Sequence, residues 1–257
     1  GIDPQVVIRP SSLQIFLGTL SGYEKGLLEE KQLKQASFHE DKILNNHTTF
    51  HEDKCEINFD SYKMDFYQKK FGEKKVETVV HEYLQGMQWV LTYYTHGISS
   101  YSWYYKEFYA PFLCDLTLGC GEYKGEKLPF GKPYPPFVQL LCVIPPKYSD
   151  ILPKPLSDFM TDEKYNLTKY YPETFKIDVS GKRQEWEGIV VLPMVDVDKV
   201  IDKYEEHYPK VEDKYKRRNR CDTSYVYKYK TRGAKYVFKS FYGNIPECNV
   251  NKISFNI

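Results

Sequence analysis

The sequence predicts an α+β fold that leans towards helix and contains extensive irregular loops. One strongly amphipathic segment, 76–94, has apolar residues at helical spacing over more than five turns. Two shorter runs, 186–193 and 225–230, are apolar or alternating, as in β-strands. Residues 119–136 hold four glycines and four prolines, a composition typical of a loop. A chain of 257 residues is long enough to bury a substantial core around such elements.

The first expected element is a helix. Apolar residues at helical spacing over 13–28 predict it, with Ser11 or Ser12 as the N-cap. The segment that follows is polar, contains the pentapeptide FHEDK twice and has no amphipathic period. We therefore expect residues 6–36 to form a helical connector and residues 37–58 to form a polar, flexible linker.

Two further helices are expected after this linker. Asp60 is a candidate N-cap for a helix that Gly72 ends. The wide apolar stripe over 76–94 predicts a longer helix, and Gly97 is placed to end it.

The second half of the chain is predicted to contain short elements. Residues 137–143 form a short apolar segment that we expect to be buried, and 177–181 is typical of a strand that enters a turn. Residues 186–193 predict a buried strand or short buried segment, and Asp196 is a candidate N-cap for a helix over 197–208. The alternation over 225–230 predicts another strand.

The composition excludes several classes of protein. The 36 Lys+Arg nearly balance the 35 Asp+Glu, so net charge neither favours nor excludes nucleic acid. The longest apolar stretch, Phe137–Pro146, is far shorter than the roughly 20 residues needed to span a bilayer, so no membrane contact is expected. Six cysteines without a CxxC pair indicate a reduced, intracellular protein with buried thiols. Residues 1–5 are typical of a tag remnant, which suggests a fragment of a longer protein.

No catalytic motif accompanies this composition. GxSxG and GxxxxGK[ST] are both absent, so the sequence favours neither serine hydrolysis nor P-loop phosphate binding. His47 and His51 could share a metal only on a rigid helix, which the polar segment around them does not predict. Asp178 and Asp196 are too few to hold two metal ions. We therefore expect neither a catalytic residue nor a metal site in this chain.

The aromatic content is the most informative feature. Tyrosine accounts for 24 residues, and the cluster Trp103, Tyr104, Tyr105 with Phe108 and Tyr109 can present faces on which bases stack. Between 210 and 239, eleven Lys/Arg accompany three acidic residues and could contact phosphates. The alternatives are that the aromatic residues pack a core and that the basic run is ordinary solvated surface.

Several motifs, in order, resemble the second conserved region of the Xrn/Rat-type 5′→3′ exoribonucleases. The resemblance is carried by FYQKKFG, MQWVLTYY, SWYY, YAPF and PFVQL, and by the spacing of residues from Tyr171 to Asp196. The chain departs from the family pattern at Lys106, Glu107 and Phe108, where the family has P-Y-H.

The resemblance implies a role for the parent protein. Residues 59–257 would be the second conserved region of an enzyme that processively degrades single-stranded RNA with a 5′-monophosphate, using magnesium. In this family the magnesium-binding acids lie in a first conserved region, which is absent here, so the chain alone is expected to be inactive. The second region is expected to wall and support the active site as part of a larger nuclease core, and to contact the first region.

The resemblance also assigns roles to residues of this chain. It implies that Trp103 stacks on the leading nucleotides. The remaining candidates are the pocket-wall residues Tyr104, Tyr105, Tyr109 and Pro111 and the basic RNA contacts Lys182, Arg217 and Arg218. Trp89 and Trp186 are expected in the core.

Two other functions stay open at this point. The chain could be a stand-alone single-stranded RNA-binding or scaffold module, or a structural domain whose apolar face docks on another protein. The expected location is intracellular, with the cytoplasm favoured and the nucleus possible.

Overall fold

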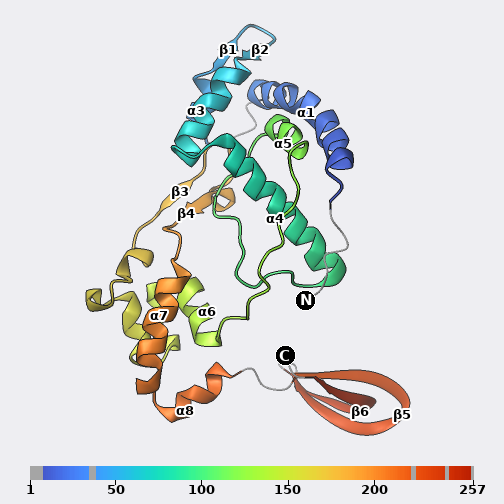
Figure 1. Cartoon of the computed structure of the whole chain (residues 1–257), viewed down its shortest axis with the longest axis vertical. Helices are drawn as coiled ribbons and strands as arrows, with labels where there is room; N and C mark the ends of the chain where they lie inside the picture. Colours follow the sequence, from blue (N-terminus) through green and yellow to red (C-terminus); the bar gives the residue numbers. More distant parts are fainter. Residues whose placement is uncertain (1–7, 35–38, 221–223, 241–242, 256–257) are drawn as a thin grey trace. The chain divides into compact units, whose positions relative to one another are not determined.

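The computed structural model of the chain describes residues 8–34, 39–220, 224–240 and 243–255. These residues divide into two compact units (Figure 1). The first comprises residues up to Pro133 together with Lys169–Met194, and the second comprises Tyr134–Thr168 with the residues from Val195 onward. Helices predominate in the described residues, whose strands form two-stranded antiparallel hairpins. The α+β, helix-leaning prediction is therefore confirmed.

The first helix, α1, spans Pro10–Leu33. Arg9 is its N-cap residue and no side chain caps it. Pro10 occupies the first turn instead. The N–H groups of the first turn have no partner within the helix, so proline loses no hydrogen bond there, and its fixed φ already suits a helix. The prediction of Ser11 or Ser12 as the cap is wrong, because both lie inside the helix.

The polar segment after α1 is not a flexible linker over its described residues, 39–58. It contains a short helix, α2 (Lys42–Asn45), and an antiparallel hairpin of β1 (Thr48–Phe50) and β2 (Cys55–Ile57). The Asp41 side chain caps α2 by accepting the N–H groups of Ile43 and Leu44. Residues 37 and 38 of the predicted linker lie outside the described residues.

Two predicted helices follow with the expected ends. α3 spans Phe59–Phe71 and α4 spans Val76–His96. Gly72 and Gly97 end them with φ of 65° and 97°, a backbone region that favours glycine. The cap of α3 differs from the prediction, because Asn58 rather than Asp60 accepts the Ser61 N–H, at 3.2 Å.

Helix α5, Leu113–Cys120, was not predicted from the sequence, and its last two residues lie in the stretch 119–136 that was expected to be a loop. Its N-cap residue offers no side-chain bond, and Glu24 of α1 accepts the N–H groups of Leu113 at 2.8 Å and Cys114 at 3.2 Å. Helix α5 also packs closely on α4, since a Cβ at Gly119 would lie 2.3 Å from Val80 Cγ1. A helix stabilised by a carboxylate 89 residues away leaves no local sequence signal.

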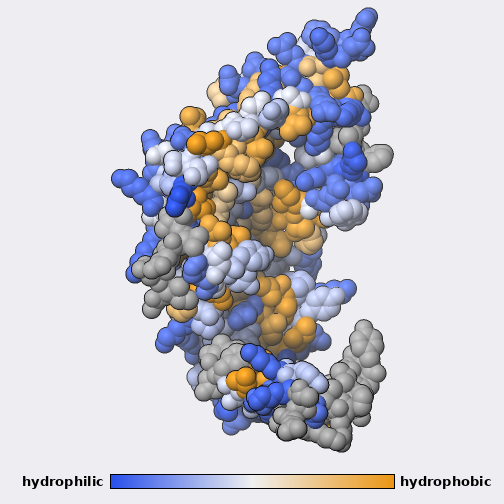
Figure 2. Space-filling model, turned by 90° about the vertical axis from the view of Figure 1, so that its right-hand side faces the viewer, coloured by the Kyte–Doolittle hydropathy of each residue, from blue (hydrophilic) through white to orange (hydrophobic). Residues whose placement is uncertain are grey.

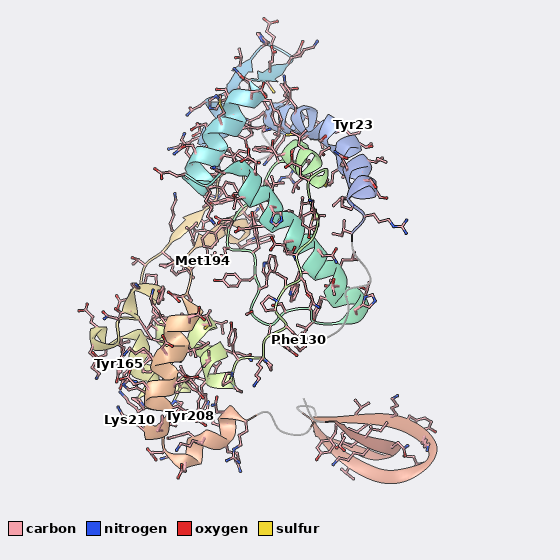
Figure 3. The ribbon with its side chains drawn as sticks, in the orientation of Figure 1. Tyr23, Phe130, Tyr165, Met194, Tyr208 and Lys210 are labelled. Carbon is pink, nitrogen blue, oxygen red and sulfur yellow. The ribbon has the colours of Figure 1, made fainter. Side chains whose placement is uncertain are left out.

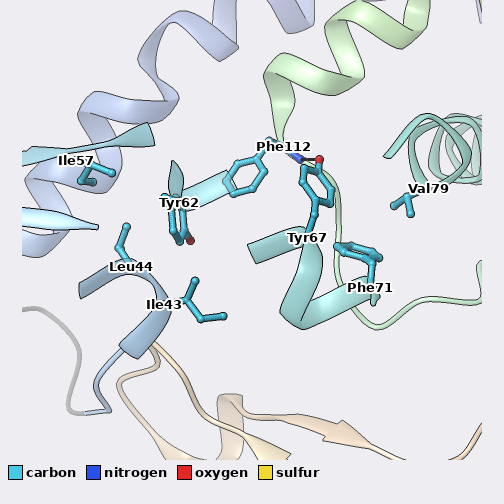
Figure 4. Close-up of a cluster of buried hydrophobic side chains, with 8 residues drawn as sticks. All are labelled: Ile43, Leu44, Ile57, Tyr62, Tyr67, Phe71, Val79 and Phe112. Atoms are coloured by element: carbon cyan, nitrogen blue, oxygen red, sulfur yellow. Dashed lines mark hydrogen bonds between the residues drawn. The ribbon is translucent and has the colours of Figure 1, made fainter. Parts of the chain in front are cut away.

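An aromatic-rich core joins α2, β2, α3 and α4 to the segment before α5 (Figure 4). Phe112 packs edge-on against Tyr62, Tyr67 and Phe66, with ring centroids 4.9–5.7 Å apart. Its N–H also donates to the Tyr67 hydroxyl at 3.0 Å. The buried members of this core are Ile43, Leu44, Ile57, Tyr62, Tyr67, Phe71, Val79 and Phe112. The hairpin before α3 is thus held by the same core as the long helices.

A small hairpin completes the first unit. β3 (Lys176–Asp178) pairs antiparallel with β4 (Ile189–Val191), and the short 3₁₀ helix η5 (Glu185–Glu187) precedes β4. The strands occur where predicted, but the second is not buried as expected. Trp186 is 82% exposed, so its assignment to the core is wrong. Trp89 on α4 is half-buried.

The second unit is built from short helices. α6 spans Pro136–Val143, α7 spans Val197–His207 and α8 spans Asp213–Lys216. The predicted burial of α6 and the predicted start of α7 are confirmed, since Phe137 and Leu141 are buried and Asp196 caps α7. The 3₁₀ helices of the intervening segments are η1 (Pro146–Ile151), η2 (Leu156–Met160), η3 (Glu163–Tyr165), η4 (Thr168–Tyr170), η6 (Tyr208–Lys210) and η7 (Arg217–Asn219).

The chain's last elements form a long two-stranded ribbon. β5 spans Ser224–Ser240 and pairs antiparallel with β6, Gly243–Phe255. The strand predicted from the alternation over 225–230 is confirmed. Among the helices that the structure describes, none is both long enough and apolar enough to cross a bilayer.

Candidate nucleic-acid interface

A pocket of about 760 Å³ lies between α4 and the irregular segment that follows it, residues 97–112, which we call the aromatic segment. Such a volume suits a small organic group such as a nucleoside. Its lining is almost entirely apolar or aromatic. Helix α4 contributes Tyr83, Gly86, Met87, Trp89, Val90, Leu91 and Tyr94, and the irregular segment contributes Trp103, Tyr104 and Tyr105. The structure thus brings three of the predicted site residues together on one surface.

Trp103 packs against a glycine of α4. A Cβ at Gly86 would lie 3.1 Å from Trp103 Cη2, a contact so short that the indole would have to shift by a few tenths of an ångström to accommodate any other residue. The Trp103 backbone N–H donates to the buried Ser100 hydroxyl at 3.2 Å, and the Trp89 indole N–H donates to the Ser100 carbonyl at 3.1 Å. Trp103 is half-buried, which leaves part of its ring facing the pocket.

The two tyrosines that follow Trp103 have different environments. Tyr104 is 42% exposed. Tyr105 is half-buried, its ring meets Tyr83 edge-on with centroids 5.3 Å apart, and its hydroxyl donates to the Tyr109 carbonyl at 2.8 Å. Burial, reinforced by the nearby Glu107 carboxylate, raises the pKa of Tyr105 well above its ordinary value. Tyr105 is therefore a neutral, fixed wall residue, whereas Tyr104 is free to meet a ligand.

Tyr109 anchors the aromatic segment to the β3–β4 hairpin. Its hydroxyl donates to Asp178 Oδ2 at 2.5 Å, and Asp178 also forms an ion pair with Lys70 of α3. Burial by itself would raise the pKa of Asp178, but hydrogen bonds from Lys70, Ser180 and Tyr109 outweigh it and hold that pKa well below its ordinary value. Pro111, next to this anchor, is buried and does not line the pocket.

The predicted basic contacts do not lie in this pocket. Lys182 is half-buried in the turn after β3, where its carbonyl accepts the His39 N–H at 3.1 Å. Arg217 and Arg218 are exposed residues of the second unit. Arg218 donates to the Ile151 carbonyl at 2.8 Å and lies 5.8 Å from the ring centroid of Phe137.

The donor groups of the described residues do not fit a metal site. No group of three or more His, Cys, Asp and Glu side chains is close enough in those residues to hold an ion. His47 contacts Asp65, with 3.2 Å between Nε2 and Oδ2, and His51 lies in the turn after β1. The part of the chain that the structure describes therefore offers no set of ligands for the magnesium ion implied by the sequence resemblance.

A signal for the helix side of the pocket is present in the apolar stripe of α4. The apolar stripe of α4 is wider than one core needs. Val79, Val80 and Leu84 are buried in the core, while the other edge of the stripe, including Met87 and Tyr94, lines the pocket. The link between Tyr109 and Asp178 had no such signal, because it joins residues 69 positions apart.

Comparison with known proteins gives consistent relatives. A family model described as "Xrn1 helical domain" matches residues 20–256. The chain is 33% identical over 204 residues to 5′-3′ exoribonuclease 2 of Debaryomyces hansenii, an alignment that covers 76% of this chain and 20% of the relative. It is 35% identical over 192 residues to human 5′-3′ exoribonuclease 1, an alignment that covers 67% of this chain and 11% of the relative.

A third relative, 5′-3′ exoribonuclease 1 of Saccharomyces cerevisiae, is 31% identical over 176 residues, covering 66% of this chain and 11% of the relative. The chain therefore spans only between a tenth and a fifth of the length of these relatives. The family model, by contrast, matches nearly the whole chain, from α1 to β6. On this evidence, the chain belongs to the Xrn1 helical domain family.

Proposed function

We propose that the chain is the non-catalytic wall of a 5′→3′ exoribonuclease that processively degrades single-stranded RNA carrying a 5′-monophosphate. Its relatives are named 5′-3′ exoribonucleases, which supports this activity for the parent protein. The aromatic pocket carries the assignment of the wall, because Trp103 and Tyr104 present partly exposed faces beside a concave, apolar surface. Aromatic faces of this kind stack on bases with little sequence preference, as a processive nuclease requires.

The same proposal leaves metal chemistry to the rest of the parent protein. The described residues do not provide a set of carboxylates for magnesium, so no step of hydrolysis is assigned to this chain. A first conserved region of the parent would supply the metal and the 5′-phosphate pocket. What this chain's own residues would do is stack on the leading nucleotides, exclude duplex and hold the wall rigid through Tyr109 and Asp178.

An intracellular location is part of the proposal. It is supported by cysteines at Cys55, Cys114, Cys120 and Cys142 that are not in disulfides. Burial raises the pKa of the Cys120 and Cys142 thiols, which lowers their reactivity.

The first test is RNA binding by Trp103→Ala, measured by fluorescence anisotropy with a short 5′-monophosphorylated single-stranded RNA. Loss of one stacked base is worth about 1–3 kcal/mol, so affinity should fall by roughly 5- to 150-fold. Trp103→Phe should retain part of the affinity, because a smaller ring still stacks.

Trp186→Ala is the matched control, since it removes an exposed tryptophan that does not line the pocket. It should bind RNA like the unchanged chain. Equal affinities for Trp103→Ala and the unchanged chain, or no measurable binding by either, would argue against contact between Trp103 and RNA. Magnesium-dependent degradation of the RNA by the purified chain would contradict the non-catalytic assignment.

The stand-alone RNA-binding module remains the second candidate. The observation that favours it is the aromatic and basic β5–β6 ribbon, whose residues do not line the pocket. The natural reading frame decides between the two, because an upstream region with strand-end acids is required only by the nuclease assignment.

A further inference from the structure

The β5–β6 ribbon carries an ordered row of exposed aromatic rings. Tyr225, Tyr227 and Tyr229 alternate along β5 and therefore share one face, and all three are exposed. Lys252 of β6 pairs with Tyr227 across the ribbon and lies on the same face. Its ammonium is 3.7 Å from the ring centroid of Tyr225 and 5.9 Å from that of Tyr227. We call these four residues the tyrosine face.

The ribbon is also strongly basic. The sequence from 224 to 255 holds six Lys/Arg and a single Glu, whereas the whole chain is nearly neutral. The face opposite the tyrosines carries Val226, Lys228 and Ile253, all exposed. A surface that combines concentrated positive charge with aromatic rings complements a polyanion with planar bases.

We propose that the tyrosine face of the β5–β6 ribbon binds single-stranded RNA, as a site separate from the Trp103 pocket. The ring centroids of Tyr225 and Tyr227 are 6.4 Å apart, about twice the 3.4 Å rise of stacked bases. One base fits between them once the two rings, now inclined by 45°, turn parallel. The Lys252 ammonium now lies over the Tyr225 ring, so it moves aside when the base enters and then neutralises the phosphate of the same nucleotide.

The charge on the face favours RNA over an apolar protein surface. A protein that covered the tyrosine face with apolar side chains would desolvate the Lys252 ammonium and leave it without an anionic partner, which is costly. RNA satisfies both groups, since each nucleotide brings a ring and a phosphate. The proposal concerns binding alone and does not require the parent to be a nuclease.

The test uses the 257-residue chain and a single-stranded oligouridine of about twelve nucleotides, a length within the range bound by small single-strand modules. The RNA carries a 5′-hydroxyl, so that recognition of a 5′-phosphate does not contribute. The double variant Tyr225→Leu/Tyr227→Leu keeps apolar side chains but removes the rings, and its affinity should fall about tenfold or more. Tyr225→Phe/Tyr227→Phe keeps the rings and should bind like the unchanged chain.

A matched pair of lysine variants tests the face directly. Lys252→Gln and Lys228→Gln remove the same charge from opposite faces of the ribbon. In a plot of log affinity against log salt concentration, each phosphate contact contributes a slope of about −0.7 for single strands. Lys252→Gln should make the slope shallower by about that amount, and Lys228→Gln should leave it nearly unchanged.

Two results would overturn the proposal. One is equal RNA affinity of the leucine double variant and the unchanged chain, which would indicate that the exposed tyrosines contact a protein rather than RNA. The other is an equal change of slope for both lysine variants, which would indicate diffuse charge rather than a site. Trp103→Ala in the same assay separates this outcome from failure of the proposed function, because Trp103 lines the pocket and no residue of the tyrosine face does.

Discussion

Asp178 ties the aromatic residues around Trp103 and Tyr109 to the rest of the first unit. It is 7% exposed, and its carboxylate receives Tyr109 from the aromatic segment and Lys70 from α3. Tyr109 in turn holds Tyr105 through its carbonyl. Three segments far apart in the sequence thus meet at one buried charge, whose removal would leave the Lys70 ammonium unpaired.

Asp178→Asn should therefore destabilise the chain at neutral pH by about 1.5–3 kcal/mol, the range for lost hydrogen bonds to a charged group. The measurement is urea unfolding at pH 7. Asp213→Asn is the control, because Asp213 pairs with Lys216 on the surface and its replacement should change stability little.

The loss of stability caused by Asp178→Asn should depend on pH. The pKa of Asp178 is lowered in the folded state, so its stabilising effect is complete above the unfolded-state pKa of about 3.9 and declines as the pH falls below that value. The stability difference between the unchanged chain and Asp178→Asn should therefore narrow from pH 7 to pH 3. A difference that stayed constant over this range would rule out the charged form as its cause.

At the scale of elements, the contact between α4 and the aromatic segment depends on Gly86. Glycine in the middle of a helix usually costs about 0.5–1 kcal/mol relative to alanine. At Gly86 that cost is offset by the close approach of Trp103, whose Cη2 leaves no room for a methyl group without a shift.

Gly86→Ala should consequently fail to gain helix stability and should displace the Trp103 indole. We expect a change in the tryptophan emission maximum and weaker binding of single-stranded RNA. Gly22→Ala on α1 is the matched control, because no atom lies within 4 Å of its would-be Cβ. It should raise the free energy of unfolding by about 0.5–1 kcal/mol with unchanged binding, and the same gain at Gly86 would contradict the contact.

At the scale of the whole molecule, exposed apolar surface is extensive. Helix α1 presents Phe16, Tyr23 and Leu27 to solvent, and Tyr23 is marked on it in Figure 3. Figure 2 shows hydrophobic side chains interrupting a mainly hydrophilic surface. Monomeric proteins seldom leave so much apolar area uncovered, so association is expected when the chain is studied by itself.

Phe16→Lys should reduce this association, because it places a charge within the exposed apolar stripe of α1. Sedimentation velocity over a range of protein concentrations measures the effect. Thr19→Lys adds the same charge at an exposed polar position of the same helix and should change association less. Concentration-independent sedimentation of the unchanged chain would refute the expectation.

Much of this organisation could be predicted from local signals. Gly72, Gly97 and Asp196 mark helix ends because their effects act within a few residues. The structure of residues 39–58 was not predicted, because their few apolar residues follow no periodic pattern and are buried only by packing on the core around Tyr62 and Phe112. Trp186 was misassigned because a large apolar residue is more often buried than exposed.

The candidate site shows the same division. Trp103, Tyr104 and Tyr105 are adjacent in sequence, so their grouping needed no tertiary information. Tyr109 and Asp178 are brought together only by folding, and the sequence did not indicate their hydrogen bond. The boundaries of the predicted connector and second conserved region, and the RNA contacts assigned to Lys182, Arg217 and Arg218, stay predictions.

The carboxylate of Glu24 bears on how this domain can be shortened. Because α5 receives its N-terminal hydrogen bonds from α1, the two helices form one cooperative folding unit although about ninety residues separate them. A version of the domain that began after Glu24 would keep every residue of α5 and lose the groups that start it. Any shorter version of the domain should therefore keep α1, because Glu24 of this helix accepts the hydrogen bonds at the start of α5.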